Sequence, residues 1–216
     1  MSSTRFLPLL LIVLVAGGCT SAYYGTWEKL GWAKRDILVD RVEEARDEQQ
    51  AAKEQIKTTL ERFQDVTNFQ GGNLEAKYKK LNGEYEDAKE SAEEVRDRIE
   101  AVETVANDMF KEWKEELKQY NSDELRRSSE QKLNQTKERY QQLITVMKDA
   151  EAKMQPVLVA FNDQVLFLKH NLNAQAIASL QTTATQIEGD VAKLIADMEK
   201  SIAEANAFID EMNKRT

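Results

Sequence analysis

Apolar and small residues recur every seven positions along most of this chain, and this spacing restricts the fold more than any other feature. The longest row is Tyr78, Tyr85, Ala92, Ile99, Ala106, Trp113 and Tyr120, with a companion row of Leu74, Leu81, Ala88, Val95, Val102 and Met109. Residues three and four positions apart lie on one face of an α-helix, so two such rows form one apolar stripe. The sequence therefore predicts long helices that pack along their length, as in coiled coils and bundles.

Three short breaks divide this pattern into four segments of similar length. Gly71 and Gly72 tolerate a left-handed turn and Asn73 is a suitable N-cap, while Asn171-Leu172-Asn173 form the last break. The middle break, Asn121-Ser122-Asp123, contains no Gly or Pro, so one helix running through it is an alternative. We expect helices at about 26–69, 73–120, 123–170 and 173–214, each about 65–70 Å long.

Because the connections are short, the four helices must fold back on one another. The predicted fold class is all-α: an elongated antiparallel four-helix bundle of coiled-coil hairpins, forming a single domain over residues 26–216. The composition agrees, since 31% of the residues are charged and only 8 Gly and 2 Pro interrupt the chain. Pro156 lies inside the third segment and is expected to bend that helix, because it has no amide proton.

The first nineteen residues have the pattern of a lipoprotein signal. Arg5 supplies a positive charge, and residues 6–16 are apolar apart from Pro8. This stretch is too short to span a membrane but has the length of a signal-peptide core. Ala16-Gly17-Gly18-Cys19 resembles the bacterial lipobox, in which the cysteine thiol receives a diacylglyceryl group and becomes the first residue after cleavage. The alternative is an ordinary secretory signal followed by an incidental cysteine.

The lipobox resemblance divides the chain into a signal peptide at 1–18, a lipid anchor and short spacer at 19–25, and the helical domain. Thr20, not Asp, follows Cys19, and in Gram-negative lipoproteins this pattern implies transport to the outer membrane. We therefore expect a protein of the bacterial cell envelope, anchored through Cys19 and facing the periplasm. Two or three acyl chains anchor a protein stably, whereas one chain holds it only marginally.

The charge and the scarcity of reactive side chains exclude several classes of function. The formal net charge is −8, so a nucleic-acid partner is not expected. The sequence contains one His and no Glu-x-x-His pair or phosphate-binding loop. We therefore predict no enzymatic activity, no cofactor and no metal site. His170 lies where the third helix should end, and its expected role is that of a helix C-terminal cation; a recognition residue is the alternative.

A small-molecule or metal-dependent activity housed between the helices is the alternative function. It would need polar residues that converge inside the bundle. The polar residues on heptad positions are Gln49, Thr59, Ser129, Thr136 and Ser201. A structure that separates them into different layers would argue against this function.

A second apolar stripe in the third helix is the candidate partner-binding site. Val159 and Leu166 fall on the outermost helical position, where a bundle helix normally carries charge, and Phe167 and His170 lie beside them. Such a stripe is what a docking surface for a protein partner or a second copy would look like. The alternative is that the Pro156 bend turns the stripe into the core, or that Phe69 and the Gly71-Gly72 turn fold over it.

Two stretches of the sequence resemble a known family. They are Glu28–Val42, which contains Gly31-Trp32-Ala33-Lys34, and Val165–Ile177, which contains Lys169-His170-Asn171-Leu172. Both are similar to the bacterial domain-of-unknown-function family 2959, over nearly the whole chain after the signal. The resemblance implies the class of protein but no activity, substrate or cofactor. Together with the anchor and the bundle, it leads us to expect a membrane-tethered, non-catalytic scaffold, adaptor or binding protein.

Overall fold

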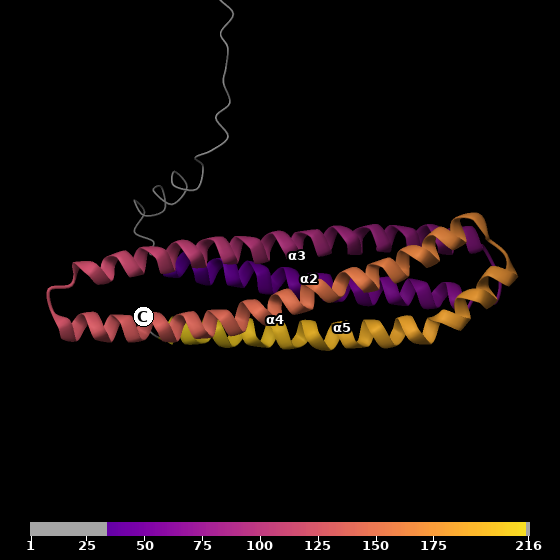
Figure 1. Cartoon of the computed structure of the whole chain (residues 1–216). Coiled ribbons are helices and arrows are strands. Elements are labelled where there is room, and N and C mark those ends of the chain that lie inside the picture. Colours follow the sequence, from indigo (N-terminus) through magenta and orange to yellow (C-terminus); the bar gives the residue numbers. More distant parts are fainter. Residues whose placement is uncertain (1–33, 215–216) are drawn as a thin grey trace, which may run out of the picture. The chain divides into compact units, whose positions relative to one another are not determined.

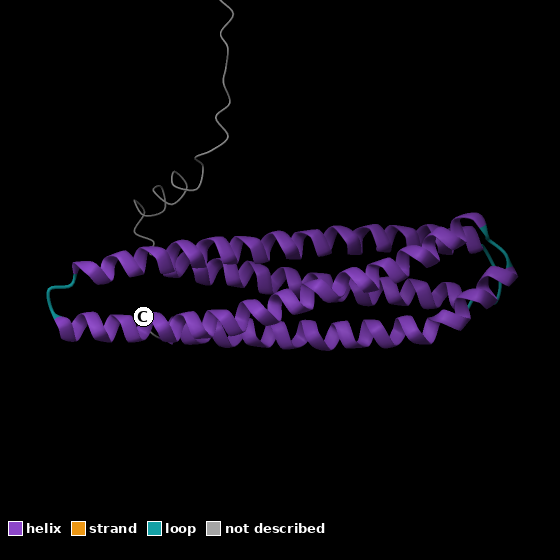
Figure 2. Cartoon of the chain, viewed as in Figure 1, coloured by secondary structure: helices purple, strands orange, loops and turns teal. Residues whose placement is uncertain are grey.

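The computed structural model describes residues 34–214, and in this part of the chain four long α-helices form one bundle. They are α2 (Lys34–Thr67), α3 (Leu74–Glu116), α4 (Asp123–His170) and α5 (Ala174–Lys214), and a short 3₁₀ turn, η1 (Leu117–Gln119), follows α3. The helices alternate in direction and lie side by side (Figure 1). Loops are confined to the ends of the described bundle (Figure 2). The predicted all-α antiparallel four-helix bundle is therefore confirmed.

Each helix packs against the next one in the chain, and α5 closes the bundle against α2. Ion pairs show which helices are adjacent. Arg98 of α3 lies 3.1 Å from Glu44 of α2, and Lys148 of α4 lies 3.0 Å from Glu103 of α3. Asp197 and Glu199 of α5 pair with Lys153 of α4 at 2.7 Å and with Lys53 of α2 at 3.5 Å, respectively. Ion pairs near the surface contribute about 0–1 kcal/mol each. The bundle is therefore held mainly by its apolar interior.

The interior is built from the heptad rows. Phe63 of α2 meets Phe161 of α4 edge to face, with 6.0 Å between the ring centroids. Other fully buried side chains are Leu38, Ile56, Leu81, Leu143, Met147, Met154, Leu168, Leu180, Leu194 and Phe208. Burying one such aliphatic or aromatic side chain contributes about 1.5–3 kcal/mol. The spacing of these residues is thus the main cause of the fold.

The turn between α2 and α3 has the backbone that its glycines allow. Gly71 and Gly72 have φ angles of +138° and +105°, which side chains with a Cβ rarely adopt. The side chain of Asn73 then accepts a hydrogen bond of 2.9 Å from the backbone N–H of Ala76. This cap starts α3 one residue later than the sequence pattern suggests, and α2 ends at Thr67 instead of 69.

The break between α3 and α4 is real, so the alternative of one continuous helix is wrong. Ser122 caps α4 by accepting a 3.3 Å hydrogen bond from the backbone N–H of Leu125. The α-helix before it ends at Glu116, and the tighter η1 turn follows. Tyr120 is consequently carried out of the core row to which its spacing assigns it, and 42% of its surface is exposed. The expected helix start near residue 26 and the anchor at Cys19 lie outside the described residues.

Candidate functional site

The outer face of α4 carries large apolar side chains that no other helix covers. We define this face by Val159, Leu166 and Phe167, together with Leu172 just beyond the end of the helix. Their exposed fractions are 48%, 50%, 40% and 39%, respectively. α4 continues through Pro156 without interruption, and Pro156 itself is exposed. The alternative that Pro156 turns the stripe inward is therefore wrong. Apolar residues at this helical position have no role in the core and leave apolar surface in contact with water.

The opposite side of the same helical turns fills the core. Leu158, Phe161, Val165 and Leu168 are each at most 4% exposed. This half of α4 thus has an apolar inner face and carries apolar side chains on its outer face as well, with the exposed Asp163 among them. A helix with large apolar side chains on two opposite faces can pack against a partner on each of them. The bundle supplies only the inner one.

Two grooves lie on either side of α4 near Pro156, where the outer face of α4 begins. The groove towards α3, of about 320 Å³, is lined by Tyr85, Lys89 and Arg96 of α3 and by Gln155, Leu158 and Asn162 of α4. Burial raises the pKa of the Tyr85 hydroxyl, and the neighbouring Glu86 raises it further. The groove towards α5, of about 400 Å³, has a floor of Val157 and Leu194. Side chains of a docked helix could therefore enter on both sides of the α4 ridge.

His170 is the last residue of α4 and is exposed. The following residue, Asn171, closes the helix, since its backbone N–H bonds to the Leu168 carbonyl at 3.1 Å and its side-chain amide donates to the Phe167 carbonyl at 2.9 Å. A basic residue at this end complements the helix dipole. The position agrees with a capping role and places His170 beside the outer face of α4.

The polar heptad residues do not converge on one cavity. Gln49 and Ser201 are hydrogen-bonded to each other in the core, whereas Ser129 accepts a 2.8 Å hydrogen bond from Trp113 near the α3–α4 turn. Thr59 is ten residues beyond Gln49, which is about 15 Å along a helix. In the described part of the chain, no group of three or more His, Cys, Asp or Glu side chains is placed to hold a metal ion. These polar residues thus lie in separate layers of the bundle and do not form the shared site that a small-molecule or metal-dependent activity between the helices would need.

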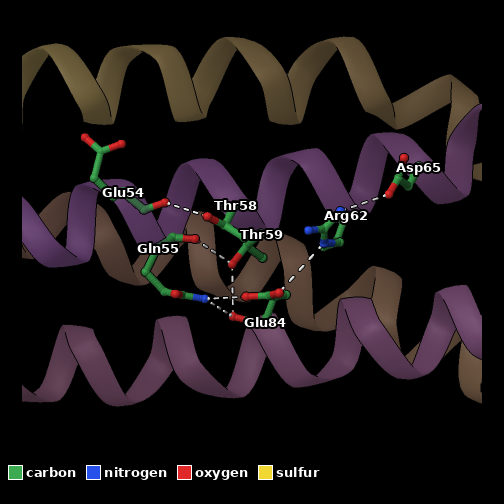
Figure 3. A network of polar contacts seen from close by, with 7 residues as sticks. All are labelled: Glu54, Gln55, Thr58, Thr59, Arg62, Asp65 and Glu84. Atoms are coloured by element: carbon green, nitrogen blue, oxygen red, sulfur yellow. Dashed lines mark hydrogen bonds and ion pairs between the residues drawn. The ribbon is translucent and has the colours of Figure 1, made fainter.

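Thr59 belongs to a polar network that joins α2 to α3 (Figure 3). Its hydroxyl donates to the Glu84 carbonyl at 2.9 Å, and the Gln55 amide donates to the Glu84 carboxylate at 2.9 Å. Arg62 completes the contact, with its Nε 3.7 Å from the same carboxylate group. All of these groups are engaged in pairing the two helices. We interpret the network as a set of contacts that fixes the register of α2 against α3.

Sequence reasoning missed one feature next to the outer face of α4. Residues 171–187, the α4–α5 turn and the first part of α5, contain no charged residue. Because 31% of the residues in the chain are charged, a stretch of this length without charge is unusual and could have been noticed in the sequence. This uncharged stretch places Leu172 and one side of α5 next to Val159, Leu166 and Phe167.

These features define a class of protein: a charged antiparallel helical bundle with one apolar ridge left uncovered. A family model described as "Protein of unknown function (DUF2959)" matches residues 23–212, so the chain belongs to this family. The resemblance seen in the sequence is thereby confirmed. Comparison with curated proteins and with solved structures found no significant match. Within residues 34–214, no helix has the length and hydropathy needed to cross a membrane.

Proposed function

We propose that the protein is a lipid-anchored, non-catalytic scaffold or adaptor of a bacterial cell envelope, held by Cys19 in the outer membrane and facing the periplasm. Its docking element is the outer face of α4. The observation that carries this proposal is the 40–50% exposure of three large apolar residues close together, Val159, Leu166 and Phe167, on a bundle with a highly charged surface. Exposed apolar surface costs free energy in water, and a binding partner would recover that free energy.

The arrangement of the helices suits a tethered protein. Cys19 precedes Lys34 by a short stretch of sequence, so a lipid on Cys19 would hold the end of the bundle at which α2 begins. The outer face of α4 and the α4–α5 turn lie at the other end of α2. With 34 residues, α2 is about 50 Å long. The bundle would thus present its docking surface roughly that far from the tethered end.

The polar side chains also support a binding role. Gln49, Ser201 and Thr59 are engaged in contacts between helices. Many of the acidic and basic side chains form ion pairs along the exposed flanks of the bundle, as Lys153 does with Asp197. These groups stabilise or solubilise the helices. Association through one surface is the function that such an arrangement favours.

The proposal is tested with two leucine substitutions in the full-length chain. Leu166→Glu places a charge on the outer face of α4, and Leu125→Glu makes the same change at a residue that is 59% exposed at the opposite end of the bundle. After chemical crosslinking in intact cells, we expect adducts of higher mass for the wild type and Leu125→Glu, and their loss for Leu166→Glu. All three proteins should remain in the membrane fraction.

Two results would count against this function. Adducts that persist unchanged in Leu166→Glu would mean that partners do not use this face. If Leu166→Glu instead abolished helicity by circular dichroism, Leu166 would belong to the core and the docking surface would not exist.

A further inference from the structure

The outer face of α4 continues onto an uncharged side of α5. Gln175, Ser179, Thr182 and Gln186 are exposed and spaced four, three and four residues apart, so they form one row along α5. Thr183, between them, bonds to Gln164 of α4 at 3.4 Å, which places this part of α5 beside α4. We call the outer face of α4 together with this α5 row the neutral face.

The neutral face differs from the rest of the molecule in charge. Between Lys153 and Glu188 the chain contains one acidic residue, Asp163, which is exposed on the outer face of α4, and one basic residue, Lys169, when His170 is counted without charge as in the formal net charge. This segment therefore has no net charge, and the whole net charge of −8 lies elsewhere. Two copies of such a protein repel each other over most of their surfaces. At the neutral face that repulsion is small, because Asp163 is its one exposed acidic side chain.

The neutral face is also complementary to itself in shape. α4 contributes large side chains, whereas the middle of the adjoining α5 row contributes the small Ser179 and Thr182, with Gln175 and Gln186 at its two ends. A two-fold axis parallel to the bundle would set the ridge of each α4 against the shallow row of the other α5, as an isologous interface requires. Because Gln164 is level with Thr183 in one copy, Phe167 would then lie level with Ser179 and Thr182 of the other.

The size of this face suits a reversible dimer. It extends over Val159–Leu172 and over Gln175–Gln186, or about 20 Å along the helices, and two adjacent helices are about 20 Å wide. Pairing would bury about 400 Å² on each copy, or about 800 Å² in total, which is the size of a weak, transient contact. Tethering both copies to one membrane would raise their effective concentration. In a two-fold pair of this kind, both tethered ends point the same way.

We propose that the occupant of the neutral face is a second copy of this chain, packed in parallel with α4 of each copy against α5 of the other. The inference rests on the proposed docking role of the outer face of α4. It adds that the partner docked on this face is a second copy of the same chain.

The test places a photoreactive benzoylphenylalanine at Phe167 of the full-length chain in its native membrane. The matched control carries the same group at Tyr120, an aromatic residue of similar exposure at the other end of the bundle (42% against 40%). We expect irradiation to give a band of twice the chain's mass from Phe167 and none from Tyr120. Peptide mapping of that band should join position 167 to residues 179–186.

A second pair of variants tests the α5 half of the interface in the same experiment. Thr182→Arg should reduce the double-mass band about tenfold, since each copy would bury a charge without a partner. Thr104→Arg changes an exposed threonine on α3, whose hydroxyl likewise bonds only to its own helix in the bonds recorded, and should leave the band unchanged. Both variants should keep the helical circular dichroism of the wild type.

The outcomes separate this inference from the proposed function. A crosslink from position 167 to a different protein would overturn self-association and leave the scaffold proposal standing. A double-mass band mapping to residues 159–172 of the second copy would overturn the parallel arrangement. The absence of any adduct from position 167 would overturn both proposals at this face.

Discussion

Ser201 of α5 donates a hydrogen bond of 2.8 Å to the side-chain oxygen of Gln49 of α2, and both side chains are fully buried. The Gln49 amide nitrogen finds no acceptor among the described residues. A buried polar pair costs stability unless every donor is satisfied, but it can fix the register of packed helices. We interpret this pair as a register device in an otherwise apolar layer.

In a Ser201→Ala background, which removes the hydroxyl that would otherwise lose its acceptor, Gln49→Met should therefore stabilise the protein, because it removes the unpaired amide at little change in volume. We expect the free energy of unfolding to rise by about 1–2 kcal/mol in chemical denaturation. Gln50→Met, at the exposed neighbouring position, is the control and should change it by less than about 0.5 kcal/mol. A loss of stability in Gln49→Met would show that the amide has a partner essential to folding.

Glu48 and Glu94 place two carboxyl groups together between α2 and α3. Burial raises the pKa of Glu48, and Glu94 raises it further by a shared hydrogen bond and by charge repulsion, while Arg98 opposes the shift. A carboxyl with a raised pKa favours folding at low pH and loses this contribution as the pH rises through the folded-state pKa. The ionised pair thus destabilises the bundle at pH 7.

Glu48→Gln should remove that cost and raise the free energy of unfolding at pH 7, by less than about 1 kcal/mol because water screens the pair. Near pH 4 the gain should shrink. Glu75→Gln is the matched control of opposite sign, since Lys79 lowers the pKa of Glu75 and holds it ionised. Equal effects of the two substitutions at pH 7 would contradict the assignment.

Tyr140 should control the response of the bundle to alkali. Its ring packs edge to face on Phe110 with centroids 5.4 Å apart, and burial, aided by Glu103, raises the pKa of its hydroxyl to about 12. An unfolded chain ionises this tyrosine near pH 10, so its contribution to stability is present below that pH and is lost as the pH rises towards 12.

Tyr140→Phe keeps the ring and removes the titrating group. Its unfolding midpoint should fall less steeply between pH 10 and pH 12 than that of the wild type, as measured by circular dichroism. Tyr120→Phe, at the exposed aromatic of the α3–α4 turn, should follow the wild-type curve. Identical curves for Tyr140→Phe and the wild type would mean that another group governs alkaline unfolding.

Much of the fold follows from the sequence because burial in a bundle obeys the helical repeat. Val42, Ile56 and Phe63 fall on one heptad row and are all completely buried. The bounds of α4, Asp123–His170, coincide with those expected from Ser122 and Asn171, whose side chains compete for backbone hydrogen bonds at helix ends. Local chemistry decides such boundaries.

The remaining differences arise where three-dimensional packing decides. Tyr120 continues a heptad row in the sequence, yet the η1 turn carries it into solvent. The exposure of Leu166 could be proposed from spacing, but whether Pro156 would rotate it inward required the structure. The α5 part of the neutral face escaped notice because Ser179 and Thr182 are unremarkable by themselves and matter only beside α4.

The tether is the part of the proposed function on which the rest depends, and intact-mass analysis of the protein extracted from native membranes tests it most directly. We predict a mature chain that begins at Cys19 and carries the added mass of a diacylglyceryl group, and we expect Cys19→Ala to accumulate as uncleaved precursor. A mature chain that begins elsewhere, or one with an unmodified Cys19, would contradict the lipid-anchored scaffold.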